Sequence, residues 1–243
     1  MQLLHNPLAR KLSGFVARSD ADFATLARFD RRNRSFQAGQ ELMHEGQVNA
    51  SAFILVKGWT CSYRLSPDGG RQIIDFHVPG DFLGLRGILF RVADRSVEAV
   101  TRLEVSEVLK SDFREAMDTA PRLSVAVLWA AMRHEAIIVE HLINLGRRSA
   151  AERLAHILLE LWTRLNFVGM ADNDGFDCPL TQYHLADALG LSAVHVNRVL
   201  RVLREDGIVT FQNGRVDFDD FDRLRTLAEF DISYLDQGGS FVR

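Results

Sequence analysis

Cysteine and proline are both scarce in this chain of 243 residues, which contains 2 Cys and 5 Pro. Cys61 and Cys178 are far apart and form no C-x-x-C pair. A single chain therefore cannot build a disulfide framework, a four-cysteine metal site or an iron–sulfur cluster. With 47% hydrophobic and 25% charged residues, the composition excludes disorder and a collagen repeat. We predict two domains of modest size in a reducing, cytoplasmic setting.

Long hydrophobic runs are absent as well. The longest, Val125–Met132, is far shorter than the roughly 20 residues that span a bilayer. Met1–Leu12 lacks the apolar core of a secretory signal, so we expect no membrane partner. The net charge is −3, from 29 Lys and Arg against 32 Asp and Glu. A polyanionic partner must therefore be bound by a local basic face.

The first half of the chain shows the alternation that is typical of short β-strands. The residues from Phe53 to Leu65 are first apolar and then alternate, which predicts a half-buried strand with Trp59, Cys61 and Tyr63 on one face. Turn residues follow at 66–70 and 79–81, and Val97–Leu109 alternates again. Strands spaced by about ten residues predict a small all-β roll or barrel.

After Lys110 the apolar period changes from that of a strand to that of a helix. Steps of four and three residues predict a long helix with a coiled-coil-like stripe. The stripe consists of Val125, Trp129, Met132, Ala136, Val139 and Ile143. It is either the seam of a homodimer or the face with which the helix covers its own sheet. Gly146 is expected to end this helix, and Ser149 to cap the next.

Two short helices joined by a glycine turn are predicted from residue 181 onward. Thr181 is the expected N-cap of the first helix, Gly190 ends it, and Ser192 caps the second. In the second helix Val196, Val199, Leu200 and Leu203 should be buried. The opposite face is predicted to be basic and free of acid, with Val194, Asn197, Arg198, Arg201 and Arg204. This order is that of a helix-turn-helix, whose second helix enters the DNA major groove.

A hairpin follows the two helices. Asn213-Gly214 favours a two-residue turn between Ile208–Phe211 and Arg215–Phe218, which predicts the wing of a winged helix. Arginine pairs with guanine and asparagine with adenine, whereas cap residues hold phosphates. His195 borders the buried face, so it either packs there or contacts DNA. The predicted DNA-binding residues are Thr181, Ser192, Val194, His195, Asn197, Arg198 and Arg201.

These ordered motifs resemble the Crp/Fnr family of bacterial transcription regulators. In the first half the resemblance rests on residues similar to the family's cyclic-nucleotide-binding β-roll: Gly39-x-x-Leu42-x-x-x-Gly46, Gly58, Asp68-Gly69 and Phe76–Gly84. In the second half it rests on Arg147–Ala155 and Leu180–Arg198. The resemblance implies an α+β fold with a β-roll (jelly roll) sensor at 1–118, a long dimerisation helix at 119–146, and a winged helix-turn-helix with a C-terminal extension at 147–243.

The resemblance also implies a homodimer that binds double-stranded DNA at a palindromic operator. With it, the stripe from Val125 to Ile143 favours dimerisation over simple packing. RNA polymerase is a further partner if the protein activates transcription. An effector pocket is implied between the β-roll and the long helix, and its predicted residues are Gly84, Leu85, Arg95, Ser96 and Ile138.

Four positions depart from the family pattern, among them Asn197, which replaces a Ser beside the retained Arg198. Members that bind cyclic AMP have a Glu where this chain has Leu85 and a Thr where it has Ile138, although Arg95-Ser96 matches their phosphate-binding pair. Two lost polar contacts of about 1 to 3 kcal/mol each weaken binding roughly a hundredfold or more, so we predict an effector other than cyclic AMP. Val194 replaces a base-reading Glu and can only touch a thymine methyl, so the operator should also differ.

The residues favour other functions less than DNA binding. Residues 1–40 contain no cysteine, which excludes the family's iron–sulfur sensing. Haem ligation by His77 or His44 and redox sensing by Cys61 are less expected than structural roles for these residues. An enzyme is not expected, because Asp75/His77/Asp81 and Asp217/Asp219/Asp220/Asp222 have no known catalytic spacing. The alternative function is an effector-binding module that regulates a protein partner.

Overall fold

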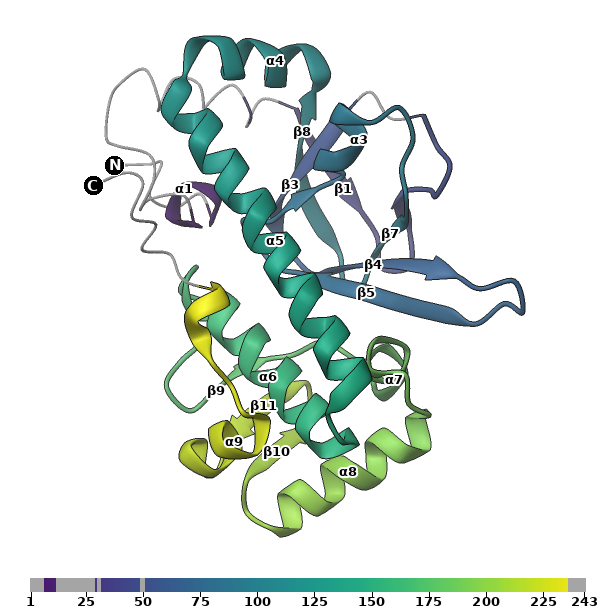
Figure 1. Cartoon of the computed structure of the whole chain (residues 1–243), viewed down its shortest axis with the longest axis vertical. Coiled ribbons are helices and arrows are strands. Elements are labelled where there is room, and N and C mark those ends of the chain that lie inside the picture. Colours follow the sequence, from purple (N-terminus) through teal and green to yellow (C-terminus); the bar gives the residue numbers. More distant parts are fainter. Residues whose placement is uncertain (1–6, 12–28, 30–31, 49–50, 236–243) are drawn as a thin grey trace. The chain divides into compact units, whose positions relative to one another are not determined.

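The computed structural model describes residues 7–11, 29, 32–48 and 51–235 (Figure 1). Residues 1–6 and 12, on which the prediction of no secretory signal partly depends, lie outside the described residues. The chain forms two compact units. The first lies within Met1–Arg64 and Phe76–Glu135, and the second consists of Leu65–Asp75 and Ala136–Leu235. The predicted domain ranges 1–118, 119–146 and 147–243 remain a prediction.

The alternating segments form two four-stranded sheets, as predicted, which lie in the first unit except for residues 65 and 71–75 of the second unit. One sheet has the strand order β1-β8-β3-β6 and the other β2-β7-β4-β5. The strands are β1 (Asn33–Phe36), β2 (Glu41–Met43), β3 (Ser51–Lys57), β4 (Thr60–Leu65), β5 (Arg71–His77), β6 (Phe82–Leu83), β7 (Ser96–Ala99) and β8 (Leu103–Leu109). Strands β3 and β8 pair in antiparallel orientation, with Ile54 opposite Ser106.

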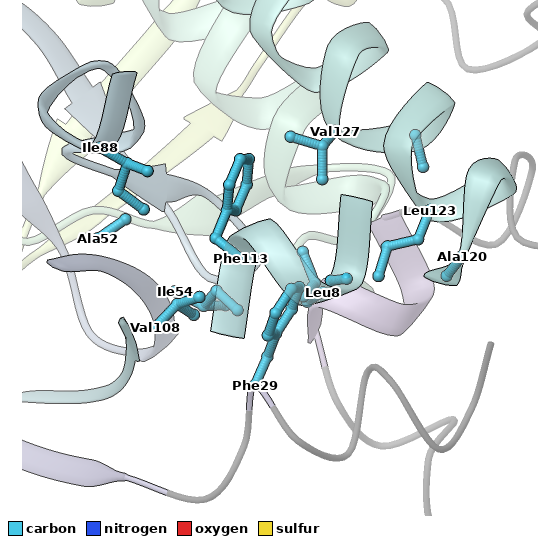
Figure 2. Close-up of a cluster of buried hydrophobic side chains, with 12 residues drawn as sticks. Leu8, Phe29, Ala52, Ile54, Ile88, Val108, Phe113, Ala120, Leu123 and Val127 are labelled. Atoms are coloured by element: carbon cyan, nitrogen blue, oxygen red, sulfur yellow. The ribbon is translucent and has the colours of Figure 1, made fainter. Parts of the chain in front are cut away.

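Strand β3 is buried on both faces, which explains why its sequence is continuously apolar. Phe53 and Leu55 belong to a cluster of buried residues that includes Met43, Val97 and Val105. Ala52 and Ile54 point to a second apolar cluster, which Figure 2 shows with helical residues of the same unit. This second cluster, called the helix-side cluster below, also contains Leu8, Phe29, Ile88, Val108, Phe113, Ala116, Ala120, Leu123, Ala126 and Val127.

The predicted strand from Phe53 to Leu65 is in fact two strands. Gly58 separates them with a φ of 93°, and a side chain there would collide with the carbonyl oxygen of Arg102. The predicted half-buried pattern is also wrong, because Thr60 and Ser62 are buried like Cys61, whereas Leu65 is 60% exposed. Alternation alone does not reveal that the polar face of β4 is buried as well.

The helices of this region are α1 (Pro7–Lys11), α3 (Leu85–Leu89), α4 (Lys110–Thr119) and the predicted long helix α5 (Pro121–Arg147). Helix α5 contributes residues to both units. It ends one residue after Gly146, and Ser149 caps the next helix as predicted, in a capping box with Glu152. Within the part of the chain that the structure describes, no helix is both long and apolar enough to cross a membrane.

The second unit is organised around a buried helix, α6 (Ala150–Asn166). Around it lie α7 (Gln182–Leu189), α8 (Ala193–Glu205), α9 (Phe221–Ala228) and the short 3-10 helix η2 (Ile232–Leu235). Its sheet has the order β10-β11-β9, from β9 (Gly175–Asp177), β10 (Val209–Gln212) and β11 (Arg215–Phe218). Strand β9 lies in a segment that its Gly, Asp and Asn residues predict as a loop, because three residues are too few to show a strand period.

Candidate nucleic-acid interface

The two helices α7 and α8 form the predicted helix-turn-helix. Thr181 caps α7 by accepting a hydrogen bond from the backbone N–H of His184 at 3.2 Å, and His184 Nδ1 accepts one from the Thr181 N–H at 3.1 Å. Gly190 ends the helix with a φ of 64°. Ser192 then caps α8 by accepting from the N–H of His195 at 3.2 Å. These caps fix the positions at which both helices begin.

Helix α8 has one buried face and one exposed face, as the spacing predicts. Val196, Val199 and Leu203 are buried, whereas Val194 is 81% exposed. Asn197, Arg198 and Arg201 are exposed as well, and His195 and Leu200 are half-buried. The prediction of a face without acid is wrong at its C-terminal end, where exposed Glu205 lies 3.8 Å from Arg201 one helical turn away. One acid against Arg198, Arg201 and Arg204 leaves the face basic.

The amide of Asn197 is held by the first helix. Its Nδ2 donates a hydrogen bond to Oε1 of Gln182, the first residue of α7, at 3.1 Å. The prediction from sequence did not include Gln182, because a polar residue after an N-cap is common in any helix. Tyr183 beside it is 72% exposed.

The wing carries less free positive charge than its sequence suggests. Its turn has the backbone of a hairpin loop, with φ of 53° at Asn213 and 76° at Gly214. On β11, Arg215 donates to Asp217 at 2.6 Å and to Asp172 at 2.8 Å. These carboxylates raise the pKa of the Arg215 guanidinium and offset its charge toward a phosphate.

A buried polar cluster joins four elements of the second unit. Arg164 on α6 donates to Asp75 on β5 at 2.9 Å and to Glu160 at 3.0 Å. On α5, Nδ1 of His141 donates to the carbonyl oxygen of Ile74 at 2.9 Å, and Nε2 donates to Glu160 at 3.0 Å. Tyr234 completes the cluster by donating to Glu160 at 3.2 Å. Asp75, Glu160 and Arg164 are at most 2% exposed.

The charges within this cluster balance. Burial alone would lower the pKa of His141, but the carboxylates of Glu160 and Asp75 and the Ile74 carbonyl raise it to about 9. Burial opposes the ionisation of Glu160, yet His141 and Arg164 hold its pKa below the ordinary value. Asp75, His141 and Glu160 have ligand atoms within 4.8 Å of one another, as a metal site would need. Arg164 already bonds both carboxylates, so this donor set does not suit a cation.

The predicted effector residues of the first unit are engaged in internal contacts. Gly84 has a left-handed backbone before α3, and Leu85 packs against the helix-side cluster. Arg95 donates to Asp94 at 3.0 Å, and the hydroxyl of Ser96 accepts from the N–H of Glu45 at 3.1 Å. Ile138 lies on α5 in the second unit and is half-buried.

The exposed apolar face of α5 differs from the predicted stripe at three of its six positions. Met132, Val139 and Ile143 are exposed by 55%, 44% and 39%, but Val125, Trp129 and Ala136 are half-buried. Trp129 packs against the helix-side cluster, because so large a ring is buried wherever a core is within reach. Leu128 and Leu142 are exposed instead, by 60% and 70%. Leu128, Met132, Val139 and Leu142 follow the heptad spacing of an interface.

Two family models match the chain in the order of these elements. The cyclic nucleotide-binding domain matches residues 33–120, and the Crp-like helix-turn-helix domain matches residues 152–227. A β-roll of this kind followed by a helix-turn-helix defines a DNA-binding transcription regulator.

Relatives extend the match over most of the chain. The nitrogen fixation regulation protein FixK of Bradyrhizobium diazoefficiens is 31% identical over 212 residues, which cover 86% of this chain and 88% of FixK. The transcriptional activator protein FnrL of Cereibacter sphaeroides is 30% identical, with 86% and 85% covered. The structure of FixK2 from Bradyrhizobium japonicum has a TM-score of 0.70 at 29% identity, with 80% of this chain and 96% of FixK2 covered.

The chain therefore belongs to the Crp/Fnr family of transcription regulators. The predicted α+β fold class and the resemblance drawn from the motifs are confirmed. Proteins of this family are transcription regulators rather than enzymes.

Proposed function

We propose that this regulator binds a palindromic operator as a homodimer, with α8 of each subunit in the major groove. Arg198 pairs with a guanine, Asn197 with an adenine, and Val194 lies against a thymine methyl. Thr181 and Ser192 position the helices on the phosphates, and His195 and Arg201 flank the base-reading residues. The observation that carries this proposal is that α8 exposes Val194, Asn197 and Arg198 together while it buries its apolar face.

The dimer seam is the exposed apolar face of α5. Leu128, Met132, Val139 and Leu142 leave large apolar side chains uncovered at heptad positions. A second copy of the same helix buries them in the manner of a coiled coil. In such a dimer the two recognition helices bind half-sites about 34 Å apart, one turn of DNA.

Cyclic AMP is not the effector under this proposal. Leu85 provides no acceptor for a ribose hydroxyl, and its side chain belongs to the apolar packing. Arg95, at the phosphate-binding position, is paired with Asp94, which opposes a second anion. Ile138 provides no hydrogen bond to a base. RNA polymerase is the further partner of this regulator where it activates transcription.

A selection of duplexes from a random pool tests the proposal, first with no ligand and then with cyclic AMP at high concentration. We expect one palindrome to be enriched equally in both pools. Arg198→Ala should relax the choice of base at one position of each half-site. The matched control Arg225→Ala, which removes an exposed arginine of α9, should leave the enriched sequence unchanged. Enrichment only with cyclic AMP would contradict our interpretation of Leu85 and Ile138, and no enrichment would favour a protein partner.

A further inference from the structure

A hydrogen bond between Gln182 and Asn197 links the first residue of α7 to the exposed face of α8. It joins two side chains that are 15 positions apart and that both reach the surface. Neither residue is needed to hold α7 against α8, because Leu185, Ala186 and Leu189 are buried on α7, as are Val196 and Val199 on α8. The packing of the two helices therefore does not depend on this hydrogen bond.

The donors and acceptors of the Asn197 amide determine what else the amide can bind while it is bonded to Gln182. A side-chain amide has two N–H donors and one carbonyl oxygen. Bidentate recognition of adenine uses one N–H, which donates to N7, and the oxygen, which accepts from the N6 amino group. The second N–H of Asn197 remains, and Oε1 of Gln182 accepts a hydrogen bond from Nδ2. The same amide can therefore bind adenine and donate to Gln182 at the same time.

We propose that Gln182 is a positioning residue for base reading, which holds the Asn197 amide in the orientation that recognises adenine. An exposed asparagine otherwise rotates freely about its terminal bond and loses this freedom on binding. Ordering such a side chain at an interface costs free energy that a pre-formed contact avoids. The turn of α7 that carries Gln182 is held in place by Leu185, which is fully buried three residues further along the helix.

This inference rests on the proposed function, since it requires Asn197 to face a base. It assigns a specificity role to α7, the helix that in this motif crosses the DNA backbone. The role is selective, because the avoided ordering cost benefits only duplexes that carry the correct base. A loss of Gln182 should therefore change the preference between bases as well as the affinity.

The test measures binding to the selected duplex and to duplexes with each other base pair at the position that Asn197→Ala affects most. We expect Asn197→Ala to reduce the adenine preference about tenfold and Gln182→Met, which keeps the size but not the acceptor, about two- to tenfold. Gln182→Glu keeps an acceptor, so it should keep the preference while its charge weakens binding to all duplexes. In the Asn197→Ala background, Gln182→Met should have no further effect on the preference.

Thr181→Ala is the control for a purely structural role. It weakens the start of α7 without touching Asn197, so it should lower the affinity for all duplexes and leave the preference unchanged. An unchanged preference in Gln182→Met, while Asn197→Ala lowers it, would overturn this inference alone. No effect of Asn197→Ala at any base pair would overturn both this inference and the proposed role of Asn197 in the operator complex.

Discussion

The protonation of His141 predicts how the stability of the second unit depends on pH. Both ring nitrogens donate hydrogen bonds, to the Ile74 carbonyl and to the Glu160 carboxylate, so the folded protein holds the imidazolium form. Burial opposes this form, but the charges of Glu160 and Asp75 overcome it and raise the pKa to about 9. The side chain is 15% exposed, so solvent screens these charges only weakly.

The magnitude follows from the difference between the folded and unfolded pKa values. Each pKa unit corresponds to about 1.4 kcal/mol, so a rise from 6.5 to about 9 amounts to about 3 kcal/mol of stability. Between these two values the folded state binds more protons than the unfolded state. The contribution is therefore complete below pH 6.5 and is lost as the pH rises through about 9.

Urea unfolding of the wild type and of His141→Gln, at one protein concentration and at several pH values from 6 to 10, measures this contribution. The difference in unfolding free energy between the two proteins cancels the titrations that they share. We expect this difference to be about 3 kcal/mol larger at pH 6 than at pH 10, and the imidazole to titrate near pH 9 by NMR. A difference that stays constant over this range, or titration near pH 6.5, would refute the imidazolium assignment.

Further predictions concern DNA binding and assembly. Arg198→Ala should cost about 1 to 3 kcal/mol of binding free energy at one base pair of each half-site, whereas Thr181→Ala should weaken binding to all duplexes alike. Titrations of the selected duplex and of its single base-pair substitutions measure both effects. Equal losses on every duplex for both variants would contradict the role of Arg198. Val139→Glu should give monomers with far weaker operator binding, and an unchanged sedimentation coefficient would rule out the seam on α5. Burial, reinforced by the charge of Arg71, lowers the pKa of His184, so its contribution to the cap of α7 is complete above pH 6.5 and declines as the pH falls below it. The matched variant His184→Gln keeps a capping acceptor that does not titrate, so operator affinity from pH 7.5 to 5.5 should fall more in the wild type than in this variant.

Local signals predict the helix-turn-helix well. Thr181, Gly190 and Ser192 act within their own turns, and Asn213-Gly214 sets its own backbone. Such signals depend on neighbours in sequence, so one chain is enough to identify them. The phase of the α5 stripe is less well predicted, because Trp129 satisfies the heptad pattern and also reaches the core of the first unit. The sequence alone does not determine whether the Trp129 ring packs in a helix–helix interface or in the core of the first unit.

The buried cluster is the part of the second unit that the sequence reveals least. Arg164 and Asp75 are 89 positions apart, and no local pattern links them. One signal exists within α6, where Glu160 and Arg164 lie four residues apart in a leucine-rich stretch of the helix. A charged pair of this kind on a helix is normally interpreted as solvent-exposed. Only the apolar residues next to the pair indicate that this turn of the helix is buried, because Ile157, Leu158, Leu159 and Leu161 together cover several faces of the helix.

The cluster also determines which movements of the second unit cost free energy. Asp75 is supplied by β5, His141 by α5, and Glu160 and Arg164 by α6. A displacement of β5 or α5 relative to α6 would separate a buried charge from its partner, which costs about 3 to 5 kcal/mol. The apolar contacts of α6 would allow small shifts at a lower cost, since neighbouring side chains can repack. The four charges therefore hold β5 and the C-terminal part of α5 in one register on α6, the helix against which the DNA-binding elements pack.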